Sequence, residues 1–184
     1  MDRSTILAGF GGQGILFAGT VLARAAMTEG QEVLWIPSYG PEMRGGTASC
    51  TVIVGDTEIG SPVVDRADAV VALNPPSLAK FEALVAPGGL LVINASLIEA
   101  EPTRTDIEIV KVPCTQLART AGDDRLVSVV ALGALLARRP LVELDSIRAA
   151  ITAIVSKKHP EFLEADLGAL DAGYRAAAAV LATA

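Results

Sequence analysis

The sequence has 184 residues, of which 51% are hydrophobic and 4% aromatic, and a formal net charge of −6. A chain of this length is expected to form one domain, residues 1–184, with a core of its own. The acidic balance and the lack of any run of Lys or Arg exclude nucleic acid and anionic membrane surfaces as favoured partners.

Targeting and redox signals are also absent from the sequence. The first apolar run has the length of a strand, not of a signal peptide, and the longest one, residues 126–137, is too short to span a bilayer. We therefore expect a cytoplasmic protein. Cys50 and Cys114 have neither a redox nor a zinc spacing, which predicts reduced thiols in the core.

The first element is a predicted strand at residues 5–8, which runs into a glycine loop at residues 9–14 and then into a helical pattern up to Gly30. A loop that leaves a strand and opens a helix can bring bare backbone N–H groups and the positive helix end against a phosphate. Its candidate binding residues are Gly11, Gly12, Gln13 and Gly14. The alternative is a tight turn whose glycines only allow helix and strand to pack closely.

The second predicted strand, residues 32–36, ends without an acidic residue, since Pro37, Ser38 and Tyr39 follow it. The dinucleotide form of the glycine motif expects an acid there to bind the ribose hydroxyls. This counts against NAD and leaves a phosphate-bearing ligand, or none.

Residues 37–46 form a second loop, too rich in Pro and Gly for regular structure. Long loops in compact chains are usually functional, and both loops should emerge at the carboxyl edge of the sheet. Arg44 is its best cation for a phosphate or carboxylate, unless it pairs with Glu42, and Tyr39 either stacks on a ring or anchors the loop. The candidate residues of this loop are Tyr39, Gly40, Arg44, Gly45 and Gly46.

The rest of the chain alternates strands with helices and then becomes helical. Residues 47–54 are predicted to form a hairpin with residues 57–59 through Gly55-Asp56, followed by strands at 69–73, 90–94 and 107–112 and a helix at 77–84. Further helices are predicted at 115–121, 124–137, 146–158 with Asp145 as N-cap, and 163 to about 181. The prediction is an α/β fold: a single three-layer Rossmann-like domain with a mixed, mostly parallel sheet of about six strands, a β-hairpin excursion and a helical C-terminal third.

No set of residues is typical of a catalytic centre or a metal site. His159, the single histidine, falls near the end of a predicted helix, where it is expected as a helix-terminal cation and not as a base or ligand. Cys, His and carboxylates show no metal spacing, and Gly55-Asp56-Thr57 lacks the rest of a thiamine diphosphate and magnesium motif. We expect no catalytic residue and no metal in this chain.

The two glycine-rich loops together resemble those of the gamma subunit of 2-oxoacid:ferredoxin oxidoreductases. The resemblance covers nearly the whole chain and extends through residues 59–64, 74–77, 88–94 and 131–133. The sequence differs from the family's pattern at two positions: Ser128 and Ser49 stand where relatives commonly carry Asn.

This resemblance implies a subunit, inactive alone, of an enzyme that converts a 2-oxoacid and coenzyme A to acyl-CoA and carbon dioxide and reduces ferredoxin. Thiamine diphosphate, Mg and iron–sulfur clusters are then expected on partner alpha, beta and ferredoxin-like delta subunits. Coenzyme A is the implied ligand of residues 11–14 and of Arg44, although residues 39–46 could equally face the catalytic subunits. The sequence of the second loop resembles most that of chains acting on 2-oxoglutarate. Pyruvate, branched-chain 2-oxoacids and arylpyruvates remain open as substrates.

Two other functions remain from the residues alone. One is a free-standing dinucleotide-binding Rossmann-like oxidoreductase, which needs the acid missing after the second strand. The other is a purely structural subunit whose glycine loops serve packing.

Overall fold

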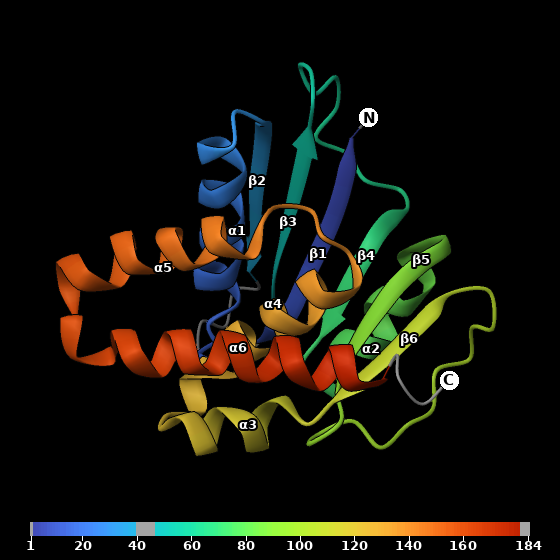
Figure 1. The fold of residues 1–184 in the computed structure, drawn as a ribbon. Coiled ribbons are helices and arrows are strands. Elements are labelled where there is room, and N and C mark those ends of the chain that lie inside the picture. The colour runs from blue at the N-terminus through green and yellow to red at the C-terminus, as the bar shows by residue number, and fades with distance from the viewer. Residues whose placement is uncertain (1, 40–46, 181–184) are drawn as a thin grey trace.

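A computed structural model of the chain describes residues 2–39 and 47–180. Its sheet has six strands in the order β2-β3-β1-β4-β5-β6 (Figure 1). β3 is antiparallel to both of its neighbours, whereas β1, β4, β5 and β6 pair in parallel. The strands are β1 (Arg3–Phe10), β2 (Glu32–Tyr39), β3 (Thr47–Gly55), β4 (Ala67–Ala72), β5 (Val85–Asn94) and β6 (Glu108–Val112).

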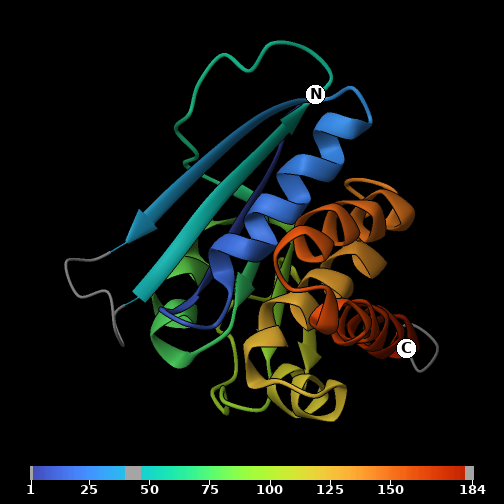
Figure 2. The ribbon, with the colours of Figure 1, turned by 90° about the vertical axis from the view of Figure 1, so that its left-hand side faces the viewer.

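Helices cover both faces of this sheet, with α2 on one face and α1 and α4 to α6 on the other (Figures 1 and 2). The helices are α1 (Ile15–Thr28), α2 (Pro75–Phe81), α3 (Cys114–Ala121), α4 (Val127–Arg138), α5 (Leu144–Lys158) and α6 (Leu163–Val180). Short 3-10 turns are η1 (Glu82–Leu84), η2 (Asp124–Leu126) and η3 (Pro160–Phe162). The predicted α/β architecture with a mixed, mostly parallel sheet is therefore confirmed.

The central strands are apolar on both faces because helices lie on both sides of them. Leu7, Val71 and Val92 belong to the core shared with α1 and α4 to α6, while Val70 and Leu91 belong to the core under α2. Successive side chains of a strand point to opposite faces, so each strand contributes to both cores.

α4 is the most buried helix, with 10 of its 12 residues buried. It contacts β4 and β5 of the sheet and also α6. The contact with α6 is close because Gly133 and Gly173 lack side chains: a Cβ added to Gly173 would overlap the carbonyl oxygen of Val130. Residues 126–137, predicted to be too short to span a bilayer, are thus a core segment. Within the described ranges, no helix combines the length and the hydropathy needed to cross a bilayer.

The predicted hairpin between residues 47–54 and 57–59 is wrong. β3 pairs with β2 on one side and β1 on the other, so residues 57–59 have no free edge to join and are not a strand. The antiparallel excursion is instead the pair of β2 and β3.

Two smaller differences concern element boundaries. α5 begins at Leu144, and Glu143 occupies the N-cap position without a side-chain cap, so Asp145 lies inside the first turn and pairs with Arg148. β5 begins at Val85 and not at residue 90 as predicted, and Pro87-Gly88-Gly89 lies within it at an irregularity of the pairing with β4.

Candidate functional site

The first glycine loop connects the end of β1 to the start of α1. Gly14 is the N-cap of α1 and adopts a left-handed φ of 76°, with no side-chain cap, and Gly12 has a φ of 97°. Gly11 and Gly12 are exposed. The N–H groups at the start of α1 have no partner within the helix, so the loop and the helix end form a surface suited to an anion.

Gln13 has a different place from the glycines around it. Its Oε1 accepts hydrogen bonds from the N–H of Phe10 at 2.6 Å and from Asn74 Nδ2 at 3.5 Å. A Cβ on Gly9 would lie only 2.6 Å from the same oxygen. The side chain of Gln13 therefore closes the loop onto the end of β1, and Gln13 does not line the cleft described next.

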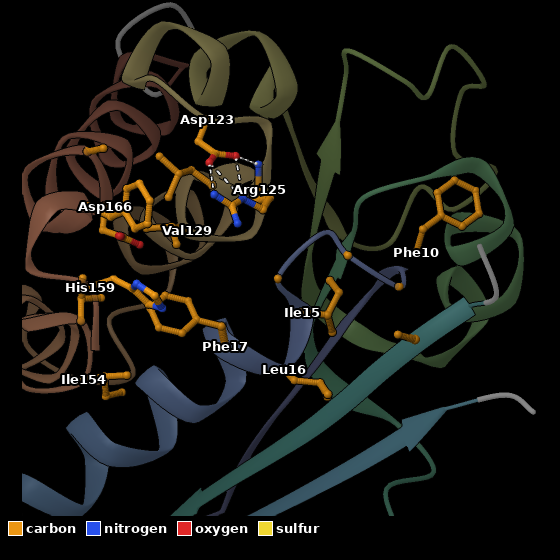
Figure 3. A pocket seen from close by; sticks show the side chains of 18 of the residues that line it. Phe10, Ile15, Leu16, Phe17, Asp123, Arg125, Val129, Ile154, His159 and Asp166 are labelled. Atoms are coloured by element: carbon orange, nitrogen blue, oxygen red, sulfur yellow. Dashed lines mark hydrogen bonds and ion pairs between the residues drawn. The ribbon is translucent and has the colours of Figure 1, made fainter. Parts of the chain in front are cut away.

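The loop forms one wall of a cleft with a volume of about 670 Å³ (Figure 3). The opposite wall comes from the helical C-terminal third, more than a hundred residues later in the chain. The side of the loop contributes Phe10, Gly11, Gly12, Gly14, Ile15, Leu16, Phe17, Thr47 and Ala48. The helical side contributes Asp123, Arg125, Leu126, Val129, Ile154, Val155, His159, Phe162, Ala165 and Asp166.

An ion pair at η2 supplies charge to the helical wall. Arg125 Nη2 donates to Asp123 Oδ2 at 2.6 Å, and this guanidinium holds the pKa of Asp123 below its usual range. Arg125 also lies 5.7 Å from the centre of the Phe162 ring, within cation–π range. The wall thus presents a largely exposed arginine beside an aromatic ring.

Asp166 differs from this pair because it is only 6% exposed and forms no hydrogen bond or ion pair with another described residue. Burial raises the pKa of its carboxyl to about 6; the charge of Asp123 adds to the rise and Arg125 opposes it. An acid in the first turn of α6 is expected from the helix dipole, so sequence patterns gave no reason to single out Asp166.

His159 is the C-cap of α5, as predicted for a residue at a helix end. Its Nδ1 lies 3.4 Å from Glu161 Oε1, and its ring lies 5.7 Å from that of Phe162. Its ring lines the cleft, which the sequence did not indicate.

The second loop begins and ends at the same edge of the sheet as the first. Phe10 pairs with Thr47, and Ala48 pairs with Tyr39 at the end of β2. The expected shared edge is therefore present. Gly40, Glu42, Arg44, Gly45 and Gly46 lie outside the described residues, so their roles stay predictions.

The strand order separates this fold from the NAD-binding arrangement. β3 lies between β1 and β2, so the end of β2 is not next to the glycine loop as it is when the first two strands pair. Ser38 and Tyr39, not an acid, occupy the end of β2.

The two cysteines are free and buried, as predicted for core thiols, and burial raises both pKa values to about 12. In the part of the chain that the structure describes, no three His, Cys, Asp or Glu side chains are grouped to hold a metal.

Residues 4–176 match the model of the pyruvate ferredoxin/flavodoxin oxidoreductase family. The chain belongs to this family. The match covers both the β1–α1 loop and the helical wall of the cleft, so both walls are part of the family domain.

Two curated relatives match most of this chain. Ketoisovalerate oxidoreductase subunit VorA of Methanothermobacter thermautotrophicus is 41% identical over 91% of this chain. The match spans only 35% of VorA, so the chain corresponds to about a third of that protein. The 2-oxoglutarate synthase subunit KorC of Methanocaldococcus jannaschii is 33% identical over 96% of this chain and 95% of its own length.

Two solved structures have the same fold. The gamma subunit of a keto/oxoacid ferredoxin oxidoreductase from Geobacter sulfurreducens has a TM-score of 0.83 at 28% identity and covers 96% of this chain and 99% of its own. A 2-oxoglutarate:ferredoxin oxidoreductase from Magnetococcus marinus, solved with 2-oxoglutarate, coenzyme A and succinyl-CoA, has a TM-score of 0.86 at 26% identity. That match covers 97% of this chain and 31% of the solved one.

The two serine departures take different places in this family member. Ser128 is 2% exposed, its Oγ has no hydrogen-bond partner among the described residues, and a Cβ on Gly14 would lie 2.5 Å from it. Ser128 therefore packs against the glycine loop. Ser49 lies in β3 between Ala8 and Ser38.

Proposed function

We propose that the chain is the gamma subunit of a 2-oxoacid:ferredoxin oxidoreductase, where it binds coenzyme A and contributes to assembly. The family match over residues 4–176 carries this proposal. It is supported by the relative solved with coenzyme A and by the cleft beside the glycine loop. The complete reaction would convert a 2-oxoacid and coenzyme A to acyl-CoA and carbon dioxide and pass two electrons to ferredoxin.

In this proposal the chain supplies binding groups and no reacting group. The N–H groups at Gly11, Gly12 and the start of α1 would bind phosphate oxygens of coenzyme A, and the apolar cleft would exclude water from its less polar parts. Partner alpha, beta and ferredoxin-like delta subunits would hold thiamine diphosphate, Mg and the iron–sulfur clusters.

We propose 2-oxoglutarate as the substrate, because of the sequence of the second loop and because two of the relatives are named for 2-oxoglutarate. Ketoisovalerate is the second candidate, because the relative named for it is 41% identical. The ratio of kcat/KM for the two 2-oxoacids in the assembled complex decides between them.

The test of the proposed function is co-purification of the tagged chain, followed by assay of ferredoxin reduction. We expect larger chains with thiamine and iron–sulfur motifs to co-purify, and activity to require all of them. The variant Arg44→Ala should raise the KM for coenzyme A in the intact complex, because it removes a fork that can bind phosphate.

Arg24→Ala is the matched control, since Arg24 is exposed on α1 and does not line the cleft. Full activity of the chain alone would contradict the subunit role. An unchanged KM for coenzyme A in Arg44→Ala would remove Arg44 from the ligand site.

Two other functions make different predictions. A free-standing dinucleotide enzyme should bind NAD(H), NADP(H) or FAD in a calorimetric titration, which the strand order and the missing acid do not favour. If the chain is a purely structural subunit, coenzyme A should bind to the assembled complex without contacting this chain.

A further inference from the structure

One charged group of the cleft has no described partner. Asp123 and Arg125 neutralise each other, and His159 lies beside Glu161, whereas the carboxylate of Asp166 has neither a hydrogen bond nor an ion pair with any described residue. Asp166 is only 6% exposed to solvent. Burying an unpaired carboxylate is costly, so this position is one where a ligand can supply the missing partner.

The surroundings of Asp166 indicate what kind of group would fit. Figure 3 shows its carboxylate directed into the cleft, between Val129 and His159. Phe17 from α1 and Phe162 from η3 add aromatic surface, and the α1 residues that line the cleft carry no charge. Besides Asp166, the described residues that line the cleft include ionisable side chains only at η2, namely Arg125 and the N-cap Asp123, and at the end of α5, namely His159. A flat ring with an N–H donor on its edge matches this combination.

We propose that Asp166 accepts a hydrogen bond from the exocyclic amine of an adenine base bound in the cleft, with the phosphates of the nucleotide toward the glycine loop. The inference rests on the proposed function, because coenzyme A carries both an adenine and phosphates. The cleft volume of about 670 Å³ lies within the range of small-molecule sites. Aromatic side chains on its walls can stack against a base, and the carboxylate gives the preference for a base that carries an amine.

The experiment measures dissociation constants on the complete purified complex for coenzyme A and for its inosine analogue, in which a carbonyl replaces the amine. We expect the complex to prefer coenzyme A by about tenfold, the size of one hydrogen bond to a charged group. The variant Asp166→Asn presents a donor as well as an acceptor, and Asp166→Leu presents neither, so both should reduce the preference to about one. Pantetheine 4′-phosphate, which lacks the base, should bind equally to all of these proteins.

Glu164→Gln is the matched control. Glu164 lies in the same first turn of α6, is exposed and does not line the cleft, so its change removes the same helix-dipole charge without touching the ligand. It should keep the tenfold preference.

Equal binding of coenzyme A and the inosine analogue to the wild-type complex would overturn this inference while leaving the coenzyme A function intact. Weaker binding of pantetheine 4′-phosphate to Asp166→Asn would also overturn it, since Asp166 would then contact the other arm of the ligand. No binding of coenzyme A to the complex would overturn the proposed role in binding, and this inference with it.

Discussion

Asp166 is destabilising for the free protein at neutral pH. Its carboxyl has a pKa near 6 in the folded chain, so at pH 7 it is largely ionised while still buried. Residues that bind ligands often carry such a cost, because the site is complete only when the ligand is present. The sequence could not reveal this, since an acid at the start of a helix is common and only the tertiary structure shows that this one is buried.

The cost of Asp166 predicts a pH-dependent effect of Asp166→Asn on stability. In the unfolded chain its pKa returns to 3.8, so the folded state binds the extra proton between about pH 4 and 6. The stabilisation that the protonated carboxyl of Asp166 gives the folded state is therefore complete below about pH 4. It is lost as pH rises from about 4 through the folded pKa of about 6. Because one pKa unit corresponds to about 1.4 kcal/mol, Asp166→Asn should raise the free energy of unfolding by about 3 kcal/mol at pH 7.5 and by only about 1 kcal/mol at pH 4.5.

Urea unfolding of the full chain at both pH values measures this difference. Glu164→Gln serves again as control and should show no such gain at pH 7.5, because Glu164 is exposed. An Asp166→Asn protein that is less stable than wild type at pH 7.5 would show that the carboxylate has a stabilising partner.

The sequence pattern predicted the position of the glycine loop but not the role of each of its side chains. The spacing identified the turn from β1 to α1, and Gly11, Gly12 and Gly14 do line the cleft. The same spacing does not separate Gln13 from its neighbours, although its side chain bonds to Phe10 and closes the loop. Which side chain turns inward depends on Asn74, 61 residues away, and no local pattern contains that information.

At the scale of elements, hydrophobic periodicity predicted where helices and strands occur but not which strands pair. Residues 47–54 were correctly expected to be a strand, yet the neighbour in sequence, residues 57–59, is not its partner. A strand inserted between two others has both edges occupied, and only the whole sheet shows this. The boundaries of α5 differ for a similar reason, because the N–H of Glu143 donates to the side chain of Glu29, the C-cap residue of α1, which is far away in sequence.

The packing of α4 against α6 gives a prediction at this scale. Gly173→Ala should lower the free energy of unfolding by about 2 to 4 kcal/mol, because the added methyl group would overlap the carbonyl oxygen of Val130 and separate the helices. Gly168→Ala, on an exposed face of the same helix with nothing within 4 Å of the added Cβ, should raise it by up to about 1 kcal/mol.

Thermal or urea unfolding compares the two variants under identical conditions. A Gly173→Ala protein as stable as Gly168→Ala would mean that α4 and α6 can move apart without loss, and the close contact would then have no structural importance.

At the scale of the whole molecule, the cleft joins parts of the chain that are distant in sequence. The glycine loop lies within the first fifteen residues, and the facing wall is made by η2, α4, α5, η3 and α6 (Figure 3). The sheet fixes the loop, and the α4–α6 contact fixes the opposite wall. The site therefore depends on the complete fold, which is why the sequence identified one wall and missed the other.

This arrangement predicts a specific pattern of hydrogen exchange when coenzyme A binds. In the purified complex, saturating coenzyme A should slow amide exchange in two segments together, residues 11–17 and residues 159–166, because a ligand between the walls opposes local opening of both. At a ligand concentration 100 times the dissociation constant, the linkage is worth about 2.7 kcal/mol, or roughly a hundredfold in exchange rate. α2 lies on the other face of the sheet and is the internal control, in which exchange should not change. Slower exchange in residues 11–17 alone would place the ligand on the glycine loop without the helical wall, and the cleft would then not be the binding site.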